Sequence, residues 1–279
     1  GAGKTIEESY WDLVVTDIES ALALLRPVYD ESEYLDGYVS VEVAPSLARQ
    51  TEGTMTAARQ LWDRINEPNL YVKIPGTVEG LPAIEQMLAE KRSINVTLLF
   101  SLSRYREVME AYLSGLERAE GDLSQVSSVA SFFISRVDVA VDAELDAVGS
   151  PEAMELRGKV AVANAVLAYE AFRATFQGPR WDALVARGAK YQRPLWASTS
   201  TKDPSFPDTL YVDALIGPHT VNTIPDSTLE AFVDHGTVSR TIDDDVAGAH
   251  AVIDGLAALG IDLEAITDGL EAVGVASFE

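Results

Sequence analysis

The chain has 279 residues, 47% hydrophobic and 8% aromatic, which is enough to bury a substantial core of helices around a sheet. Its formal net charge of −23 has the wrong sign for a nucleic-acid binder and favours an acidic, solubilising surface. The lack of cysteine excludes disulfides and thiolate chemistry, and no apolar run reaches the ~20 residues of a membrane span. No signal peptide is visible, so we expect a soluble cytoplasmic protein.

Helical and strand patterns alternate along the chain. In chain order they predict a helix over residues 9–29, a strand over 38–43, a helix over 47–63, a strand over 70–74, a helix over 81–90, a strand over 94–100 and a helix over 103–117. Further on they predict a strand over 128–134, helices up to Phe176, strands over 193–199, 211–216 and 221–224, and helices over 246–259 and 263–273.

Alternating strands and helices predict a parallel sheet with helices outside it, in a single domain over residues 1–279. The expected fold is an α/β barrel of the TIM (β/α)8 type, in which seven strands are recognisable. Because the chain begins in a helix, we expect the eighth strand to lie upstream of Gly1, which would make the barrel N-terminally incomplete. An open seven-stranded sheet is the alternative.

Three successive strands place polar side chains on one face. Alternate side chains of a barrel strand point inward and outward. The apolar positions share one parity and are expected to face the outer helices: Val39, Val41, Val43, Leu70, Val72, Ile74, Val96, Leu98 and Phe100. The positions left to point inward are Ser40, Glu42, Tyr71, Lys73, Asn95 and Thr97.

Lys73 is the first candidate for a catalytic residue. Lysine and glutamate are almost never fully buried unless they are paired, and burial of an amine favours its neutral, nucleophilic form. Lys73 and Glu42 also lie late in their strands, and the C-terminal strand ends carry the active sites of such barrels. The pattern predicts a Schiff-base site, and a structural ion pair between Lys73 and Glu42 is the alternative.

The segments around Lys73 resemble the signature of transaldolases. The resemblance lies in YVKIPGTVEG at 71–80, followed at the matching distance by INVTLLFS at 94–101. Residues 39–43 resemble the family's glutamate strand, and residues 128–136 and 195–199 resemble its later strands. The resemblance covers nearly the whole chain and is closest to the longer bacterial form.

For the catalytic residues, the resemblance implies that Lys73 forms a Schiff base with a ketose donor. Glu42 and Thr97 would hold a water that shuttles protons during carbinolamine formation and dehydration. The family also has an acid/base aspartate on its first strand. This sequence has no such segment, as expected if the first strand lies upstream of Gly1.

For substrate binding, the resemblance assigns Asn95 to substrate hydroxyls and Ser131 to the orientation of the dihydroxyacetone unit. Arg136 would bind the sugar phosphate, for which a guanidinium fork is well suited. Ser198 matches another substrate-binding serine. Some members have a phosphate-binding arginine shortly after that serine, and here Lys202 is the candidate for its role.

The function implied is the transfer of a dihydroxyacetone unit from sedoheptulose 7-phosphate or fructose 6-phosphate to an aldose phosphate, in the pentose phosphate pathway. The expected partners are sugar phosphates, with no cofactor, nucleic acid or membrane, and a homodimer is the assembly to test. One alternative is a Schiff-base aldolase that releases the three-carbon unit. Another is a non-catalytic barrel fragment that only binds sugar phosphates.

Three other patterns predict no site. Residues 1–5 end like a phosphate-binding loop but lack its upstream glycine and strand. His219, His235 and His250 lack the spacing of a helical metal pair, so no metal site is expected. The acidic run at 243–245 fits a solvated helix start rather than a calcium loop.

Overall fold

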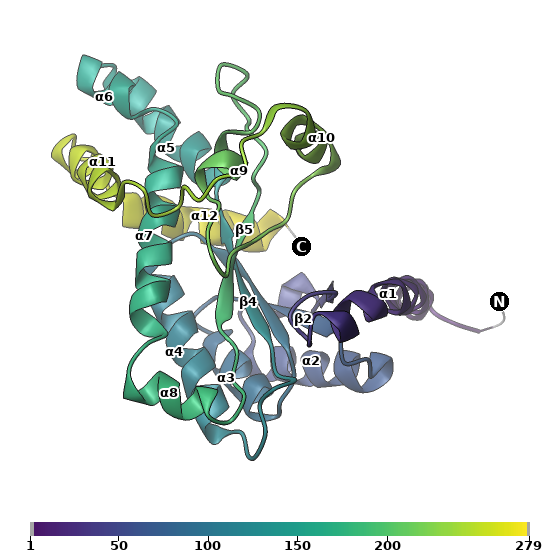
Figure 1. Cartoon of the computed structure of the whole chain (residues 1–279). Helices are drawn as coiled ribbons and strands as arrows, with labels where there is room; N and C mark the ends of the chain where they lie inside the picture. Colours follow the sequence, from purple (N-terminus) through teal and green to yellow (C-terminus); the bar gives the residue numbers. More distant parts are fainter. Residues whose placement is uncertain (1–2, 278–279) are drawn as a thin grey trace.

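The computed structural model describes residues 3–277, and these residues contain one parallel sheet that curls into a half-barrel (Figure 1). The spatial order of the strands equals their order in the sequence, as expected when each crossover returns the chain beside the strand it has just left. The strands are β1 (Val39–Glu42), β2 (Leu70–Pro75), β3 (Ile94–Leu99), β4 (Ser128–Phe133), β5 (Gln192–Ala197) and β6 (Val221–Asn222).

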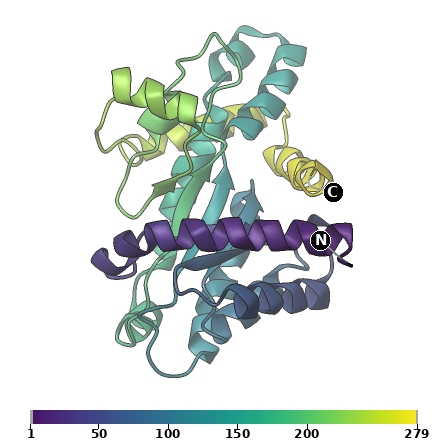
Figure 2. The same ribbon diagram turned by 90° about the vertical axis from the view of Figure 1, so that its right-hand side faces the viewer.

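Helices precede the sheet, connect its strands and follow it. They are α1 (Ile6–Glu31), the 3-10 turn η1 (Pro45–Leu47), α2 (Thr51–Ile65), α3 (Leu81–Ala89), α4 (Leu102–Arg118), α5 (Ser135–Val148), α6 (Pro151–Leu156), α7 (Val160–Thr175), α8 (Pro179–Val185), α9 (Leu210–Ala214), α10 (Asp226–His235), α11 (Val246–Ala258) and α12 (Leu263–Ser277). In Figure 2, α1 crosses the width of the molecule beside α2, to which Asp12 and Arg64 join it by an ion pair of 2.6 Å.

The prediction of seven strands is wrong, because the residues described contain six. The segment predicted as a strand at 211–216 forms α9 instead. A short apolar run does not distinguish strand from helix by itself, and tertiary contacts decide it here. The Tyr211 hydroxyl donates to Asp138 of α5 at 2.8 Å, and Thr209, the N-cap residue, donates to the Asp213 carboxylate at 2.7 Å.

The sheet is open within the residues described, with β1 and β6 as its two edges. These edges correspond to the two predicted strands at 38–43 and 221–224. β6 is only two residues long, which limits the backbone that it leaves unpaired. Because the strands follow one another in sequence order, the predicted polar positions of β1, β2 and β3 lie on adjacent strands.

The N-terminus of α1 shows how local sequence sets a helix boundary. Thr5 forms a capping box with Glu8, in which the Thr5 hydroxyl accepts from the Glu8 amide at 3.1 Å and the Glu8 carboxylate accepts from the Thr5 amide at 2.7 Å. Thr5 therefore begins a helix rather than closing a phosphate loop. Residues 1 and 2 of that predicted motif lie outside the described residues.

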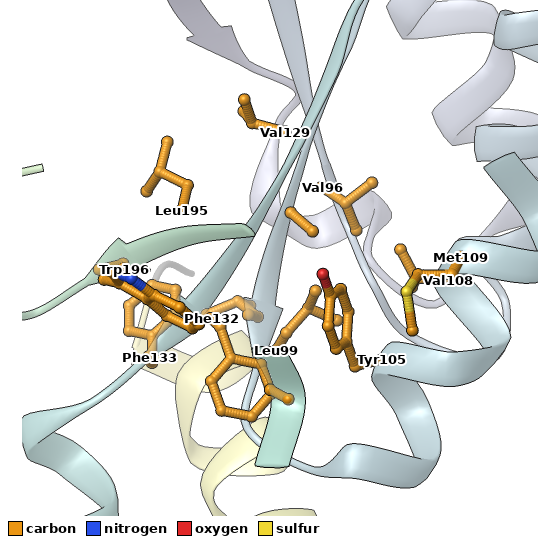
Figure 3. Packing of buried hydrophobic residues seen from close by; sticks show 14 of the residues in the cluster. Val96, Leu99, Tyr105, Val108, Met109, Val129, Phe132, Phe133, Leu195 and Trp196 are labelled. Carbon is orange, nitrogen blue, oxygen red and sulfur yellow. The ribbon is translucent and has the colours of Figure 1, made fainter. Parts of the chain in front are cut away.

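The main core lies between the sheet and its covering helices. Figure 3 shows Val96 and Leu99 of β3 against Tyr105, Val108 and Met109 of α4, with Phe132 and Trp196 beside them. These side chains are at most 1% exposed. Burying each such side chain stabilises the fold by about 1.5–3 kcal/mol, so this layer holds the strands that carry the polar face.

Among residues 3–277 no single helix is long and apolar enough to cross a membrane. α11 and α12 reach that length and composition only as a pair, across a bend of 92°.

Candidate active site

The register of the sheet places three predicted site residues in one row. Glu42 is the partner of Lys73 across β1 and β2, and Lys73 is the partner of Asn95 across β2 and β3. Side chains in one row of a parallel sheet point to the same face. The predicted grouping of Glu42, Lys73 and Asn95 on one face is therefore confirmed.

Lys73 and Glu42 form a direct ion pair within this row. The Lys73 Nζ lies 3.2 Å from the Glu42 Oε2, and the side chains are 25% and 27% exposed. Burial of three quarters of each side chain strengthens the attraction between the two charges. At 3.2 Å, a proton can pass directly between the amine and the carboxylate.

Asn95 links β1 to β4 beside this pair. Its side-chain amide donates to the Ser40 Oγ at 3.1 Å, and its carbonyl oxygen accepts from the Ser131 Oγ at 2.7 Å. Asn95 and Ser131 are 5% and 3% exposed. Because both ends of the Asn95 amide are engaged, its orientation is set before any ligand arrives.

Thr97 follows Asn95 on β3 and is 1% exposed. Within the described part of the chain, its hydroxyl has no hydrogen-bond partner. The strand does not continue in strict alternation beyond it, because the pairing with β4 shifts between Val96 and Leu99. The strict alternation predicted for Val96, Leu98 and Phe100 is therefore wrong at Leu98, because Leu99 shares the direction of Val96 (Figure 3).

Arg136 stands in the first turn of α5, just after the end of β4. Its guanidinium lies over the ring of Phe133, 5.3 Å from the ring centroid. Among the side chains that the structure describes, no carboxylate forms an ion pair with it. The helix N-terminus and an unpaired guanidinium together make a positively polarised position suited to an anion.

Ser198 lies beside Arg136 through its contacts with Ser135. The two hydroxyls are 2.8 Å apart, and the Ser135 amide donates to the Ser198 carbonyl at 3.0 Å. Ser198 has a φ of 57°, in the left-handed region that non-glycine residues rarely adopt. The end of β5 is thereby held against the start of α5.

Lys202 lies further along the loop that follows β5, and its contacts are local. Its Nζ donates to the Ser200 Oγ at 2.7 Å. It lines a cavity of about 380 Å³ together with Arg157, Asp142 and Asp203. Lys202 thus shares this cavity with carboxylates and with the Arg157 guanidinium, whereas Arg136 lies at the start of α5, so Arg136 remains the better phosphate candidate.

Three side chains that the sequence analysis did not assign contact the predicted site residues. Ser40 bonds Asn95, Phe133 supports Arg136, and Ser135 bonds Ser198. Ser40 already has inward parity in the sequence. The contact of Ser135 with Ser198, by contrast, becomes visible only in the structure, because Ser198 follows β5 and β5 lies beside β4.

Below this row, tyrosines fill the inner face. Tyr38 stacks on Tyr71 with their ring centroids 4.0 Å apart, and the Tyr71 hydroxyl shares a 2.6 Å hydrogen bond with Ser127. Burial raises the pKa of Tyr71 to about 12. Tyr71 therefore stays protonated and closes the lower part of the half-barrel rather than acting as a base.

The motifs from which we predicted no site have structural partners. His235 contacts Asp208 and Asp234, His250 contacts Glu170, and the His219 ring lies against Tyr191. Asp245 caps α11 through the Gly248 amide, which confirms the predicted helix start. No group of three or more His, Asp or Glu side chains that could hold a metal ion occurs in the part of the chain described.

Fold and site together define a class of protein. A curled parallel α/β sheet carries a lysine–carboxylate pair and amide and hydroxyl groups on the inner face of β1, β2 and β3, and Glu42 is the last residue of β1. This is the architecture of a barrel-type α/β enzyme, whose site lies at the C-terminal ends of parallel strands.

The chain belongs to the family described as transaldolase/fructose-6-phosphate aldolase, whose profile matches residues 1–279. A transaldolase of Acidothermus cellulolyticus is 53% identical over 281 residues, which cover 99% of this chain and 75% of the relative. A transaldolase of a Parafrankia species is 51% identical, with 100% of this chain and 80% of the relative covered. A transaldolase of Mycobacterium tuberculosis is 49% identical, with 99% of this chain and 76% of the relative covered.

This similarity over nearly the full chain supports transaldolase function, a transferase activity of carbohydrate metabolism. The family implies sugar phosphate substrates. The resemblance found in the sequence is thereby confirmed.

Proposed function

We propose that this protein transfers a dihydroxyacetone unit from a ketose phosphate, sedoheptulose 7-phosphate or fructose 6-phosphate, to an aldose phosphate, with Lys73 as the nucleophile. The observation that carries the proposal is the pairing of Lys73 with Glu42 at 3.2 Å on the inner face, with a quarter of each side chain exposed.

The first steps use groups that the sheet places in or next to one row. Glu42 accepts a proton from the Lys73 ammonium, and the free amine adds to the C2 carbonyl of the ketose to form a carbinolamine. The hydroxyl of the carbinolamine leaves as water after it receives a proton, and the product is the protonated Schiff base. Glu42, next to the nitrogen, and the unpartnered Thr97 hydroxyl are suited to hold the water that carries these protons.

Cleavage of the C3–C4 bond releases an aldose phosphate and leaves the three-carbon unit on Lys73 as an enamine. The electrons of the broken bond enter the C2–nitrogen system, and the C4 hydroxyl gives its proton to a water molecule. The enamine then adds to the acceptor aldehyde, whose oxygen takes up a proton, and water hydrolyses the resulting Schiff base to free Lys73. Asn95 and Ser131, which are fixed by their mutual hydrogen bond, are placed to orient the hydroxyls of the three-carbon unit.

The phosphate group of the donor is assigned to the start of α5. Arg136 offers a guanidinium there that has no ion pair among the described side chains, and Ser135 and Ser198 offer hydroxyls next to it. The side chain of Lys202 stays in its acidic cavity in this arrangement. We also infer that the six strands form part of a TIM (β/α)8-type barrel, since Glu42 ends β1 and since Arg136 and Ser198 follow the ends of β4 and β5.

Trapping with borohydride tests the proposal. The protein is incubated with fructose 6-phosphate, reduced with borohydride and mapped by peptide mass spectrometry. We expect a reduced three-carbon adduct on Lys73, abolished by Lys73→Arg and unchanged by Lys91→Arg. An adduct on Lys91 or Lys202, or none on the folded protein, contradicts the assignment.

Dependence on the acceptor separates the two reactions known to this family by name. A transferase releases the three-carbon unit only when an aldose phosphate acceptor is added. Release of the free three-carbon product at the same rate without an acceptor would identify a Schiff-base aldolase instead.

A further inference from the structure

The irregularity in β3 lies directly beside a proposed catalytic residue. Leu98 has a φ of 61°, and the pairing of β3 with β4 shifts between Val96 and Leu99. A non-glycine residue in this conformation costs about 1–3 kcal/mol and persists only where its surroundings enforce it. Bulges of this kind commonly re-aim a side chain next to an active site. The residue that precedes Leu98 is Thr97.

The bulge changes which helix each side chain meets. Val96 and Leu99 both lie on the side of β3 that faces α4 (Figure 3), although strict alternation would put residues three apart on opposite faces. Leu98 turns toward α12 instead. A Cβ placed on Gly274 would lie 3.1 Å from the Leu98 Cδ2 and 3.7 Å from the Phe100 Cε2. Leu98 is 2% exposed, so its side chain is buried at this contact with α12.

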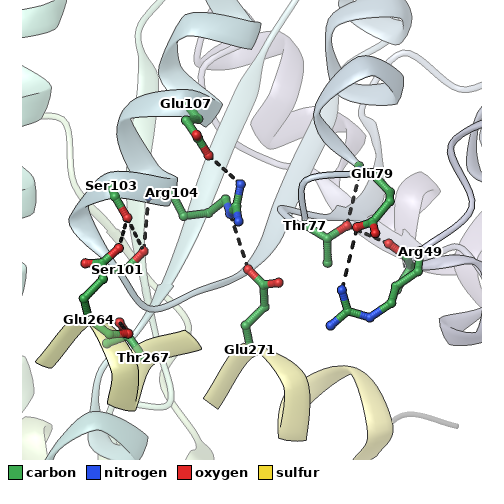
Figure 4. A network of polar contacts seen from close by, with 12 residues as sticks. Arg49, Thr77, Glu79, Ser101, Ser103, Arg104, Glu107, Glu264, Thr267 and Glu271 are labelled. Carbon is green, nitrogen blue, oxygen red and sulfur yellow. Dashed lines mark hydrogen bonds and ion pairs between the residues drawn. The ribbon is translucent and has the colours of Figure 1, made fainter. Parts of the chain in front are cut away.

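α12 is held in place by polar contacts with α4, which Figure 4 shows. The Arg104 Nε lies 3.4 Å from the Glu271 Oε2, and these side chains are only 16% and 14% exposed. Burial raises the pKa of Glu271, and Arg104 opposes that shift. Ser103 also donates a hydrogen bond to Glu264. The position of Gly274 opposite Leu98 is therefore fixed from α4, the helix that directly follows β3.

We propose that the packing contact between Leu98 and Gly274 positions the Thr97 hydroxyl for Schiff-base formation at Lys73. Thr97 has no hydrogen bond of its own to orient it within residues 3–277, so its direction depends on the backbone of the bulge. Gly274 allows α12 to approach closely enough to press on Leu98, because any larger side chain would meet Leu98 first. The inference rests on the proposed function, since it assigns a role in the same reaction.

The test compares Gly274→Leu with Gly269→Leu. Both glycines lie in α12, but a Cβ on Gly269 would meet nothing within 4 Å. The rate of borohydride trapping is measured against fructose 6-phosphate concentration. We expect Gly274→Leu to lower the rate at saturation by about tenfold or more, as small misplacements of reacting groups do. The half-saturating concentration should stay within about twofold, because Arg136 follows another strand.

Size exchange separates positioning from a general structural role. Leu98→Ala alone removes the contact and should also slow trapping, whereas Leu98→Ala combined with Gly274→Leu restores the filled volume. We expect the double variant to recover most of the wild-type rate, which is a coupling that independent effects would not produce. If Gly274→Leu does not fold, Gly274→Ala replaces it, since the only tight contact of its methyl is with the flexible tip of Leu98, and Phe100 lies at an ordinary contact distance.

Equal rates for Gly274→Leu and Gly269→Leu, or slow trapping that Leu98→Ala does not rescue, would overturn the positioning role while wild-type trapping stands. A wild-type protein that forms no adduct on Lys73 would instead refute the proposed function, and the positioning role with it.

Discussion

At the scale of single residues, Glu42 contacts the Lys73 amine at 3.2 Å. Asn95 lies in the same row, one strand beyond Lys73. The Glu42 carboxylate is the acidic group that contacts Lys73 within residues 3–277. The proposed proton transfers therefore depend on it more than on any other side chain in the site.

Glu42→Gln keeps the size of the side chain and removes the base. We expect Schiff-base trapping to slow by about 10²-fold or more, a usual loss for a general acid/base. Glu52→Gln, an exposed change of the same charge on α2, should leave the trapping rate unaltered. A trapping rate that Glu42→Gln leaves unchanged would assign Glu42 to structure only.

Arg136→Ala should weaken binding of fructose 6-phosphate by about 1.5–3 kcal/mol, the range for hydrogen bonds to charged groups. Binding of unphosphorylated dihydroxyacetone should change little, because it lacks the phosphate. The ratio of the two affinities, from the concentration dependence of trapping, measures the effect. Equal losses for both ligands would show that Arg136 is not the phosphate ligand.

Asp138 is a buried carboxyl outside the site that should make stability depend on pH. It is 2% exposed, and burial raises its pKa from 3.8 to about 6. The folded state thus holds its proton more tightly than the unfolded state does, so this contribution is fully present below about pH 4 and is lost as pH rises through about 6. The total change is on the order of 3 kcal/mol at most.

Asp138→Asn removes this titration and can still accept a hydrogen bond from the Ala161 amide. The unfolding free energy of the wild type, relative to Asp138→Asn, should fall between about pH 4 and pH 6 and then level off. Denaturant unfolding at several pH values measures it. A difference that does not vary with pH, or that grows in favour of the wild type as pH rises, would contradict the assignment.

At the scale of elements, close approach between helices decides which small residues are needed. α3 and α4 pack at Gly115, where an added Cβ would lie 2.7 Å from the Glu85 carbonyl oxygen and 2.7 Å from the Leu88 Cβ. Neither atom is the end of a flexible side chain. The contact between these two helices, which flank β3, therefore depends on the absence of a side chain at position 115.

Gly115→Ala should destabilise the protein by about 1–3 kcal/mol through overpacking, although alanine favours helix. Gly269→Ala, in α12 with open space around its Cβ, should stabilise it by about 0.5–1 kcal/mol through helix propensity alone. Thermal or denaturant unfolding of both variants checks the opposite signs. Two changes of the same sign would mean that helix contact does not dominate at Gly115.

At the scale of the whole molecule, charge is the dominant feature: 44 acidic residues face 21 basic ones. Such an excess stabilises the dissolved chain against association but destabilises the compact state by self-repulsion. An anionic sugar phosphate must then approach against the general field, and a local cation, the role that we propose for Arg136, would offset this repulsion.

Added salt should therefore raise the melting temperature. The Debye length falls from about 30 Å at about 0.01 M salt to about 3 Å at about 1 M, which screens the repulsion between distant carboxylates. Sodium and potassium chloride should act alike, because screening is not specific to the ion. A melting temperature that falls steadily with either salt would mean that attractive ion pairs outweigh the repulsion.

Much of the site followed from the sequence because its determinants are local. Alternation along a strand places Lys73, Glu42 and Asn95 on one face, and this holds wherever a strand is regular. Helix α11 begins after Asp245, as the acidic run predicted, whereas α1 begins three residues before the predicted position because Thr5 and Glu8 form a capping box. The family resemblance also rested on contiguous runs of residues around Lys73.

Only the tertiary structure decided the features that depend on residues far apart in the chain. α9 replaced a predicted strand because Tyr211 finds Asp138, and the bulge at Leu98 broke the alternation where α12 meets β3. The contact of Ser198 with Ser135 arises because β5 lies beside β4. Local propensities are weak, so contacts of this kind outweigh them, and no pattern within a single segment contains them.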